Sequence, residues 1–404
     1  MQTTFRTCAL ALACASLASV GNAQGSVSPK DGITWADLLG KGSRVQLYGF
    51  LRLDQVYDTD RFNNPKTPYY VRSPDASPDN KNSEYAMHSR LSRLGLTVDG
   101  KQIKGLGNPK LSGKVEVDFY NSGVGDSDSR NALRMRLGYL GLNWGSWSVL
   151  AGQDWDVISP LMPAVNHDTV MWYNGNLGDR RPQLTAKNVT EVGAGNQVIT
   201  EFGLALTGAV GGTSTDPGLV SGEASGRPML NARVGYHGKA KNGPYQFGVW
   251  GHQAEERYDA TGGGEMDFDS NSLGVDMKFP LFSDSLSFSG EYHTGENMKD
   301  VRGGIITGVN ATSGMEVSSM GGWGEVAYKL SNRTSLYAGY TFEDPDDDDL
   351  SAGGYAKNTV PYVAARWNFE DLKIGLEYLK WSTEYIGMAD GDADRVVLWI
   401  SYYF

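Results

Sequence analysis

Hydrophobic and polar residues alternate along most of the chain, in short segments separated by polar stretches. In the clearest segment, Leu111, Gly113, Val115, Val117 and Phe119 alternate with Lys110, Ser112, Lys114, Glu116 and Asp118. Side chains of a strand point alternately to its two faces, so each such segment predicts a strand with one apolar and one polar face. About sixteen segments of this kind lie between residue 45 and the last residue, which predicts an all-β chain.

The connections between the predicted strands alternate in length. Long polar connections lie at 58–87, 121–130, 155–179, 210–228, 255–269, 297–319, 344–356 and 383–392, and short ones at 100–108, 145–146, 239–243, 280–283, 331–333 and 370–371. Short periplasmic turns and long outer loops are typical of a transmembrane antiparallel β-barrel. The stretch 188–196 is an exception, because it is longer than a periplasmic turn should be. A barrel of about 16 strands brings both termini to the periplasmic side and holds water in its lumen.

The last ten residues predict the strand that closes this barrel. Val396, Leu398, Ile400, Tyr402 and Phe404 fall on one face of an extended segment. A final strand that pairs with the first leaves no open sheet edge in lipid. The segment resembles the closing strand of bacterial outer-membrane barrels, in which the terminal phenylalanine is read by the barrel-assembly machinery. By this resemblance, Phe404 is the terminal assembly signal.

The first 23 residues predict a secretory signal peptide. Arg6 precedes an apolar stretch from Cys8 to Val20, and the small residues of 21–23 place a cleavage site before Gln24. The apolar stretch is too short for a transmembrane helix. Both cysteines lie within it, so we expect the mature chain to contain none; a lipoprotein site at Cys14 fits the preceding residues poorly. We therefore divide the chain into the signal peptide 1–23, a short periplasmic N-terminal lead 24–43 and a barrel 44–404.

Composition excludes two other classes of protein. The chain has 36 basic and 47 acidic residues, a net charge of −11, and so lacks the basic surface that nucleic-acid binding requires. No run of eighteen apolar residues follows the signal peptide, which argues against a helical membrane protein. Strands with a single apolar face suit a transmembrane barrel in spite of a mean hydropathy of −0.38.

The mature chain resembles the sixteen-stranded trimeric porins of Gram-negative bacteria. It looks most similar to the DcaP-like type through residues 48–54 (YGFLRLD), 88–95 (HSRLSRLG) and 152–155 (GQDW), although it lacks the long helical extension that some relatives carry. The resemblance implies a homotrimer in the outer membrane, in contact with lipid and lipopolysaccharide, that lets small hydrophilic solutes diffuse passively. It also implies that the third outer loop, 155–179, folds into the pore. The alternative is a plain surface loop.

Alternation also predicts which charged side chains enter the lumen. The predicted pore-lining basic residues are Arg52, Arg93, Lys114, Arg134, Arg136, Arg180 and Arg181, with Arg233 as a further candidate. The acidic residues expected to face them from the pore loop are Asp154, Asp156 and Asp168, besides Glu116 and Asp118 of the wall. Basic residues opposite carboxylates would set up a transverse field, and we predict a modest preference for small anions such as carboxylates. Alternatively, these charges only solvate the wall or pair with one another.

Two other functions are weighed against a general porin. An enzyme is not expected, because the sequence has no Gly-x-Ser-x-Gly and no His-Glu-x-x-His, and its five histidines are scattered. No catalytic residue, metal site or cofactor is therefore predicted. A substrate-specific channel for sugars or phosphate is the closer alternative. In that case Tyr48, Phe50, Trp250 and Trp399 would form an aromatic track, whereas in a general porin they pack against the wall. The aspartates at 346–349 are read as a solvated loop in preference to a site for divalent cations.

Overall fold

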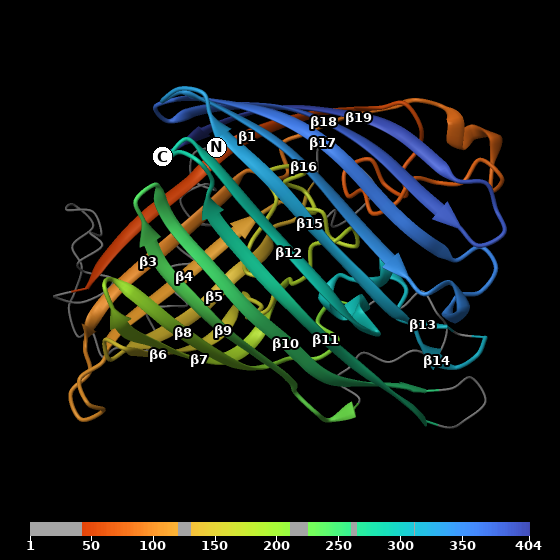
Figure 1. Cartoon of the computed structure of the whole chain (residues 1–404). Helices are drawn as coiled ribbons and strands as arrows, with labels where there is room; N and C mark the ends of the chain where they lie inside the picture. The colour runs from red at the N-terminus through yellow and green to blue at the C-terminus, as the bar shows by residue number, and fades with distance from the viewer. Residues whose placement is uncertain (1–42, 120–130, 211–224, 260–264, 311) are drawn as a thin grey trace, which may run out of the picture.

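The structure is a computed structural model, and it describes residues 43–119, 131–210, 225–259, 265–310 and 312–404. The predicted signal peptide and residues 24–42 of the predicted lead lie outside the described residues. Everything described forms one barrel with its loops (Figure 1).

Long, tilted strands make up nearly all of the regular structure (Figure 1). The strands are β1 (Arg44–Asp58), β2 (Glu84–His88), β3 (Arg93–Gln102), β4 (Lys110–Asp118), β5 (Arg134–Asn143), β6 (Trp147–Trp155), β7 (Arg180–Gly193), β8 (Asn196–Ala205), β9 (Met229–Ala240), β10 (Gly243–Asp259), β11 (Glu265–Pro280), β12 (Leu286–Glu296), β13 (Val309–Asn310), β14 (Met315–Glu316), β15 (Ser318–Lys329), β16 (Thr334–Pro345), β17 (Tyr355–Phe369), β18 (Leu372–Tyr385) and β19 (Gly391–Tyr403). The helical turns are η2 (Pro78–Lys81), η4 (Met298–Val301), η5 (Gly304–Ile306) and η6 (Asp347–Asp349). Within the described ranges, no helix is both long and apolar enough to cross a membrane.

The barrel closes where the last strand meets the first. β19 pairs antiparallel with β1, from Phe50 opposite Tyr403 to Asp58 opposite Arg395. The backbones of Gly49 and Phe404 exchange two hydrogen bonds of 3.1 Å below this ladder. The predicted role of the C-terminal segment as the closing strand is therefore confirmed, and the described part of the wall has no open edge in lipid.

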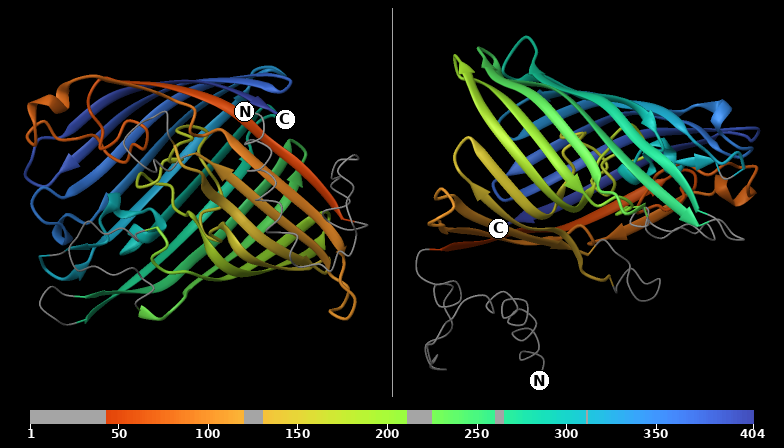
Figure 2. Two further views of the ribbon diagram at one scale, coloured as in Figure 1. Left: turned by 180° about the vertical axis from the view of Figure 1, so that it is seen from behind. Right: turned by 90° about the horizontal axis from the view of Figure 1, so that it is seen from below.

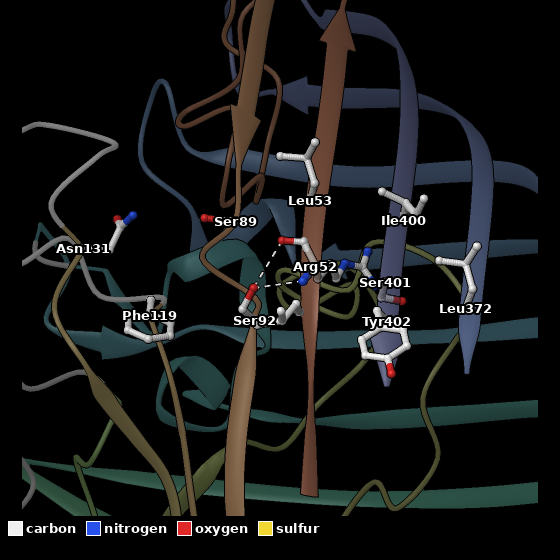
Figure 3. Close-up of a pocket in the computed structure, with 11 residues that line it drawn as sticks. Arg52, Leu53, Ser89, Ser92, Phe119, Asn131, Leu372, Ile400, Ser401 and Tyr402 are labelled. Carbon is white, nitrogen blue, oxygen red and sulfur yellow. Dashed lines mark hydrogen bonds between the residues drawn. The ribbon is translucent and has the colours of Figure 1, made fainter. Parts of the chain in front are cut away.

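One position in the wall is shared by two strands. The main sheet has seventeen strands, but β2 pairs with the C-terminal part of β1 (54–58) and β3 with its N-terminal part (44–50). Counting β2 and β3 as one broken strand gives the sixteen strands that the sequence predicts. Between them, the backbone N–H of Arg52 donates to the Ser92 hydroxyl at 2.9 Å, and that hydroxyl donates back to the Arg52 carbonyl (Figure 3).

The short and long connections lie at opposite ends of the barrel, which we call the turn end and the loop end. Two predicted connections are corrected. The stretch 188–196 is mostly strand, because β7 continues to Gly193 and leaves Ala194 and Gly195 as the turn; both have positive φ. The predicted loop 255–269 is largely strand as well, because β10 and β11 stay paired as far as Asp259 and Glu265. The paired ends of these two strands are rich in polar residues, which is why the sequence there was predicted to be a loop.

Exposure follows the predicted alternation on most strands. Leu47 and Leu51 of β1 and Leu398 and Ile400 of β19 face outward and are exposed, whereas Arg52 faces inward and is buried. A β-bulge breaks the pattern on β5, where Glu116 pairs with Leu137 but Val117 pairs with Met135. The bulge reverses the faces beyond it, so Leu137, which uninterrupted alternation from Arg136 would place outward, is buried.

Candidate functional site: the charged lumen

The loop after β6, residues 156–179, lies inside the barrel and is drawn in yellow to green in Figure 2. Its apolar side chains Ile158, Val165, Met171 and Leu177 are almost fully buried. They belong to two separate clusters: Val165 and Met171 pack with Val360, Leu379 and Trp381, and Ile158 and Leu177 pack with Trp250. The loop therefore packs on the barrel wall along its length.

Four inward-facing glutamates on the wall from β12 to β18 accept hydrogen bonds from this loop; they are Glu291, Glu325, Glu343 and Glu377, and we call them the anchor glutamates. Glu291 accepts from the Ser159 hydroxyl and from the N–H of Leu161 at 2.8 Å. Glu325 accepts from the N–H of Ala164 at 2.9 Å.

The other two anchor glutamates continue this row. Glu377 accepts from the N–H of Asn166 at 2.8 Å and from the Trp399 indole at 3.0 Å. Glu343 accepts from the N–H of Gly175 at 3.1 Å and from that of Gly304 at 2.7 Å. Buried carboxylates of this kind are stable only with such donors. Sequence analysis missed all four, although alternation on their strands already placed them inward.

Buried ion pairs hold the root of the loop. The Arg181 guanidinium contacts Asp156 at 2.7 Å and Asp300 of η4 at 2.6 Å, and its side chain has no exposed area. Arg302 contacts Asp179 at 2.5 Å. Burial alone would raise the pKa of Asp179, but Arg302 and Arg180 outweigh burial and hold that pKa below its usual range. The loop root is thus fixed to the segment that follows β12.

The tip of the loop lies between charged groups of β1, β2 and β17. The two ring nitrogens of His167 lie 3.2 Å from Arg52 and 3.1 Å from Arg366. Burial and these two cations hold the pKa of His167 well below its usual value, so the ring is neutral. The next residue, Asp168, lies 3.4 Å from His88 and 3.2 Å from Arg90.

The wall from β3 to β5 carries cations that remain partly open to the lumen. The side chains of Arg93 and Lys114 are each 26% exposed and that of Arg134 is 22% exposed. Arg136 is more buried and contacts Glu116 at 2.8 Å and Asp118 at 3.1 Å. These carboxylates are themselves buried, with exposed side-chain fractions of 5% and 0%. This side of the lumen therefore presents cations to water and keeps their carboxylates behind them.

The remaining sequence-predicted site residues fall into different surroundings. Arg52 is buried and bonds to Asp54 at 2.9 Å. Arg180 is also buried; it contacts Asp179 at 3.0 Å and lies 4.6 Å from the Trp155 ring centre. Asp154 lines a cavity of about 490 Å³ inside the wall of β5 to β8, together with Lys187 and Glu201.

Five predicted pore residues are placed differently from the prediction, since the side chains of Arg52 and Arg180 are only 4% and 5% exposed and are hardly accessible from the lumen. Arg181 and Asp156 are fully buried in one ion-pair cluster, so a solute in the lumen cannot reach either side chain. Asp168 is 7% exposed and contacts His88 and Arg90 instead of facing the basic wall. The sequence could not show this, because the partners Asp300 and His88 lie far from them along the chain.

The aromatic track considered for a sugar channel is not available in this form. Trp250 and Trp399 are 2% and 3% exposed, and each lies flat where a Cβ on Gly274 or Gly375 would stand. No group of three metal-binding side chains occurs in the described ranges. A groove of about 750 Å³ lined by Leu51, Ile400 and Tyr402 lies on the outer face of the wall, away from the lumen (Figure 3).

Comparison with known proteins identifies the fold to which this geometry belongs. No family model matches the chain, and no curated protein matches it by sequence. Among solved structures, it is similar to the outer membrane channel DcaP of Acinetobacter baumannii, with 19% identity, a TM-score of 0.68, and coverage of 90% of this chain and 98% of that one. The fold is that of an outer-membrane porin. The predicted β-barrel and its likeness to the DcaP-like type are thereby confirmed at the level of the fold.

Two further porin structures agree with this assignment. The anion-selective porin from Comamonas acidovorans is 14% identical, with a TM-score of 0.57 over 90% of this chain and all of that one (100%). OmpF of Salmonella typhi, in complex with daunomycin, is 13% identical, with a TM-score of 0.56 over 90% of this chain and 98% of that one. At these identities the likeness concerns the porin fold, and function must be argued from the lumen itself.

Proposed function

We propose that this porin-fold chain works in the Gram-negative outer membrane as a water-filled channel for the passive diffusion of small hydrophilic solutes. The outward face of the barrel supports this, because its exposed side chains are largely leucine, valine and aromatic residues, as a lipid-facing surface requires. The lumen supports it too, because charged side chains line its inner face. In this setting the turn end faces the periplasm and the loop end faces outward.

The channel prefers small anions such as carboxylates. One observation carries this part of the proposal: the wall from β3 to β5 offers Arg93, Lys114 and Arg134 to water, while the anchor glutamates opposite lie buried beneath the loop. A charge influences a passing ion most where water and the ion can approach it. The lumen is therefore more basic than the net charge of −11 indicates.

The loop 156–179 narrows this channel, and three copies of the chain assemble in the membrane. The loop's hydrogen bonds to the anchor glutamates support the first point, since they hold it across the lumen. The porin fold supports the second.

Reversal potentials in planar bilayers test the proposed function. The purified, unheated full chain should form stable channels, and a gradient of potassium chloride should give a potential of the sign produced by chloride permeation. Clear selectivity for potassium would reject the anion preference, and the lack of any conductance would reject the channel. A current that a sugar blocks in a saturable way would favour the substrate-specific alternative.

A further inference from the structure

Two cations near the turn end of the lumen rest on aromatic rings. The Lys373 ammonium of β18 lies 3.9 Å from the ring centre of Tyr403 on β19. The Arg366 guanidinium of β17 lies 4.9 Å from the ring centre of Tyr337 on β16. Neither residue was singled out from the sequence.

Both side chains belong to one patch of the inner wall. Asn368, two residues along the strand from Arg366 and on the same face, pairs with Lys373. Lys373 in turn pairs with Ser401, which is buried and faces inward. The patch lies beside the first residue of β18, so it is at the turn end and below the tip of the loop.

A second feature sets this patch apart from the rest of the inner wall. On the wall from β7 to β11, Lys187 contacts Glu201 at 3.0 Å and Arg233 contacts Asp276 at 2.8 Å. Among the described residues, neither Lys373 nor Arg366 takes part in an ion pair with a carboxylate.

The hydrogen bonds of Arg366 leave its charge in place. It donates to the Ala164 carbonyl and contacts His167 at 3.1 Å, and both of these partners are uncharged. Its Nε atom is buried and has no partner among the described residues. Lys373 likewise has a neutral ring beneath it.

We propose that Lys373 and Arg366 form a binding subsite for small inorganic anions at the turn end of the lumen. A ring face holds a cation in a fixed place by attraction to its quadrupole, but, unlike a carboxylate, it does not cancel the positive charge. Two cations fixed in this way on neighbouring strands present a positive surface to any anion that has passed the loop. The subsite rests on the proposed channel function for its role in transport, although binding alone does not require conduction.

Selectivity measurements on a matched set of variants test the subsite. Lys373→Gln should lower the chloride-to-potassium permeability ratio about twofold, the effect of one unit charge roughly 8 Å from the path of an ion in screened water. Tyr403→Phe keeps the ring and should leave the ratio unchanged. Lys380→Gln changes an exposed, outward-facing lysine of the same strand and should also leave it unchanged. A Lys373→Gln ratio equal to that of the wild type would overturn the proposal.

A binding measurement separates the subsite from the channel. In detergent solution, the wild type should broaden the NMR line of chloride, and inorganic phosphate should compete with this effect. Lys373→Gln should lose at least part of the broadening, and Arg366→Gln, also folded by circular dichroism, should lose a further part. Equal broadening in all three proteins would overturn the subsite. Broadening without any conductance would keep the subsite and reject the proposed channel instead.

Discussion

The wall from β3 to β5 and the wall from β12 to β18 both point charged side chains into the lumen, yet the two walls use them differently. On the first wall, Arg93 and Arg134 stay partly exposed and have buried carboxylates beside them. On the second, the anchor glutamates are buried, and their carboxylate oxygens accept hydrogen bonds from backbone N–H groups of the loop. The first wall therefore keeps its cations available to water, and the second uses its carboxylates to hold a structural element.

This difference shows why a count of charged residues is a poor guide to such a pore. The anchor glutamates contribute to the net charge of −11, but an ion in the lumen meets the loop instead of the carboxylates behind it. The interaction between two charges falls with the distance between them, so the partly hydrated cations, which ions can approach most closely, act most strongly on passing ions. The predictions below test each side of this comparison.

The largest effect, a loss in the free energy of unfolding, is expected from removing a buried cation that holds the root of the loop and does not face the pore. Arg181→Met removes the cation that lies between Asp156 and Asp300 and leaves two buried carboxylates without it. Breaking a buried ion pair in this way costs about 3–5 kcal/mol. Denaturant unfolding in detergent should show this loss in the free energy of unfolding.

An exposed ion pair provides the control for Arg181. Arg227 contacts Glu255 at 2.5 Å, but its side chain is 70% exposed. Arg227→Met should change the free energy of unfolding by no more than about 1 kcal/mol. Equal effects of the two substitutions would mean that the buried cluster does not hold the loop root.

A comparable effect is expected from removing one anchor glutamate. Glu377→Leu leaves the Asn166 N–H and the Trp399 indole without their acceptor, at about 1–3 kcal/mol for each buried donor. The tip of the loop should then leave the wall, and single-channel conductance should rise. Glu384→Gln, at an exposed position of the same strand, should keep the wild-type conductance. An unchanged conductance in Glu377→Leu would show that the loop does not limit the current.

The sequence predicted the strands well because alternation is a local signal. It placed Arg134 and Arg136 inward and Leu398 and Ile400 outward, and the structure agrees. It could not locate the bulge opposite Glu116, since a bulge depends on how two strands pair and not on either strand alone. Uninterrupted alternation from Arg136 therefore gives the wrong face for Leu137.

The site was harder to predict because its partners are distant along the chain. Arg181 and Asp300 are 119 residues apart, and Asn166 and Glu377 are 211 apart. No periodicity links such residues, and only the closed barrel brings them together. The inward face of the anchor glutamates was readable from alternation, but their attachment to the loop was not. Sequence analysis accordingly placed Asp156 and Asp168 in the pore, although ion pairs bury both.

A modest effect is expected on the basic wall. Arg134→Gln removes a partly exposed cation, so the chloride-to-potassium permeability ratio should fall about twofold, as expected for one unit charge near the path of an ion in screened water. Arg257→Gln, at an outward ion pair with Asp267 at the loop end, should leave the ratio unchanged. If both ratios equal that of the wild type, the partly exposed cations of this wall do not set the selectivity.

The smallest expected effect is a pH dependence that His167 gives to the docked loop. The folded barrel holds the pKa of this ring below its ordinary value of 6.5, because burial and the cations of Arg52 and Arg366 disfavour its protonation; Glu377, 3.7 Å away, opposes them only in part. Below pH 6.5 the undocked loop therefore binds more protons than the docked loop, so docking weakens as the pH falls. Hydrogen exchange of residues 164–170 should become faster between about pH 6.5 and pH 5 in the wild type, after correction for intrinsic rates. His167→Gln should remove this component. If the variant retains the full pH dependence, a group other than His167 must be responsible.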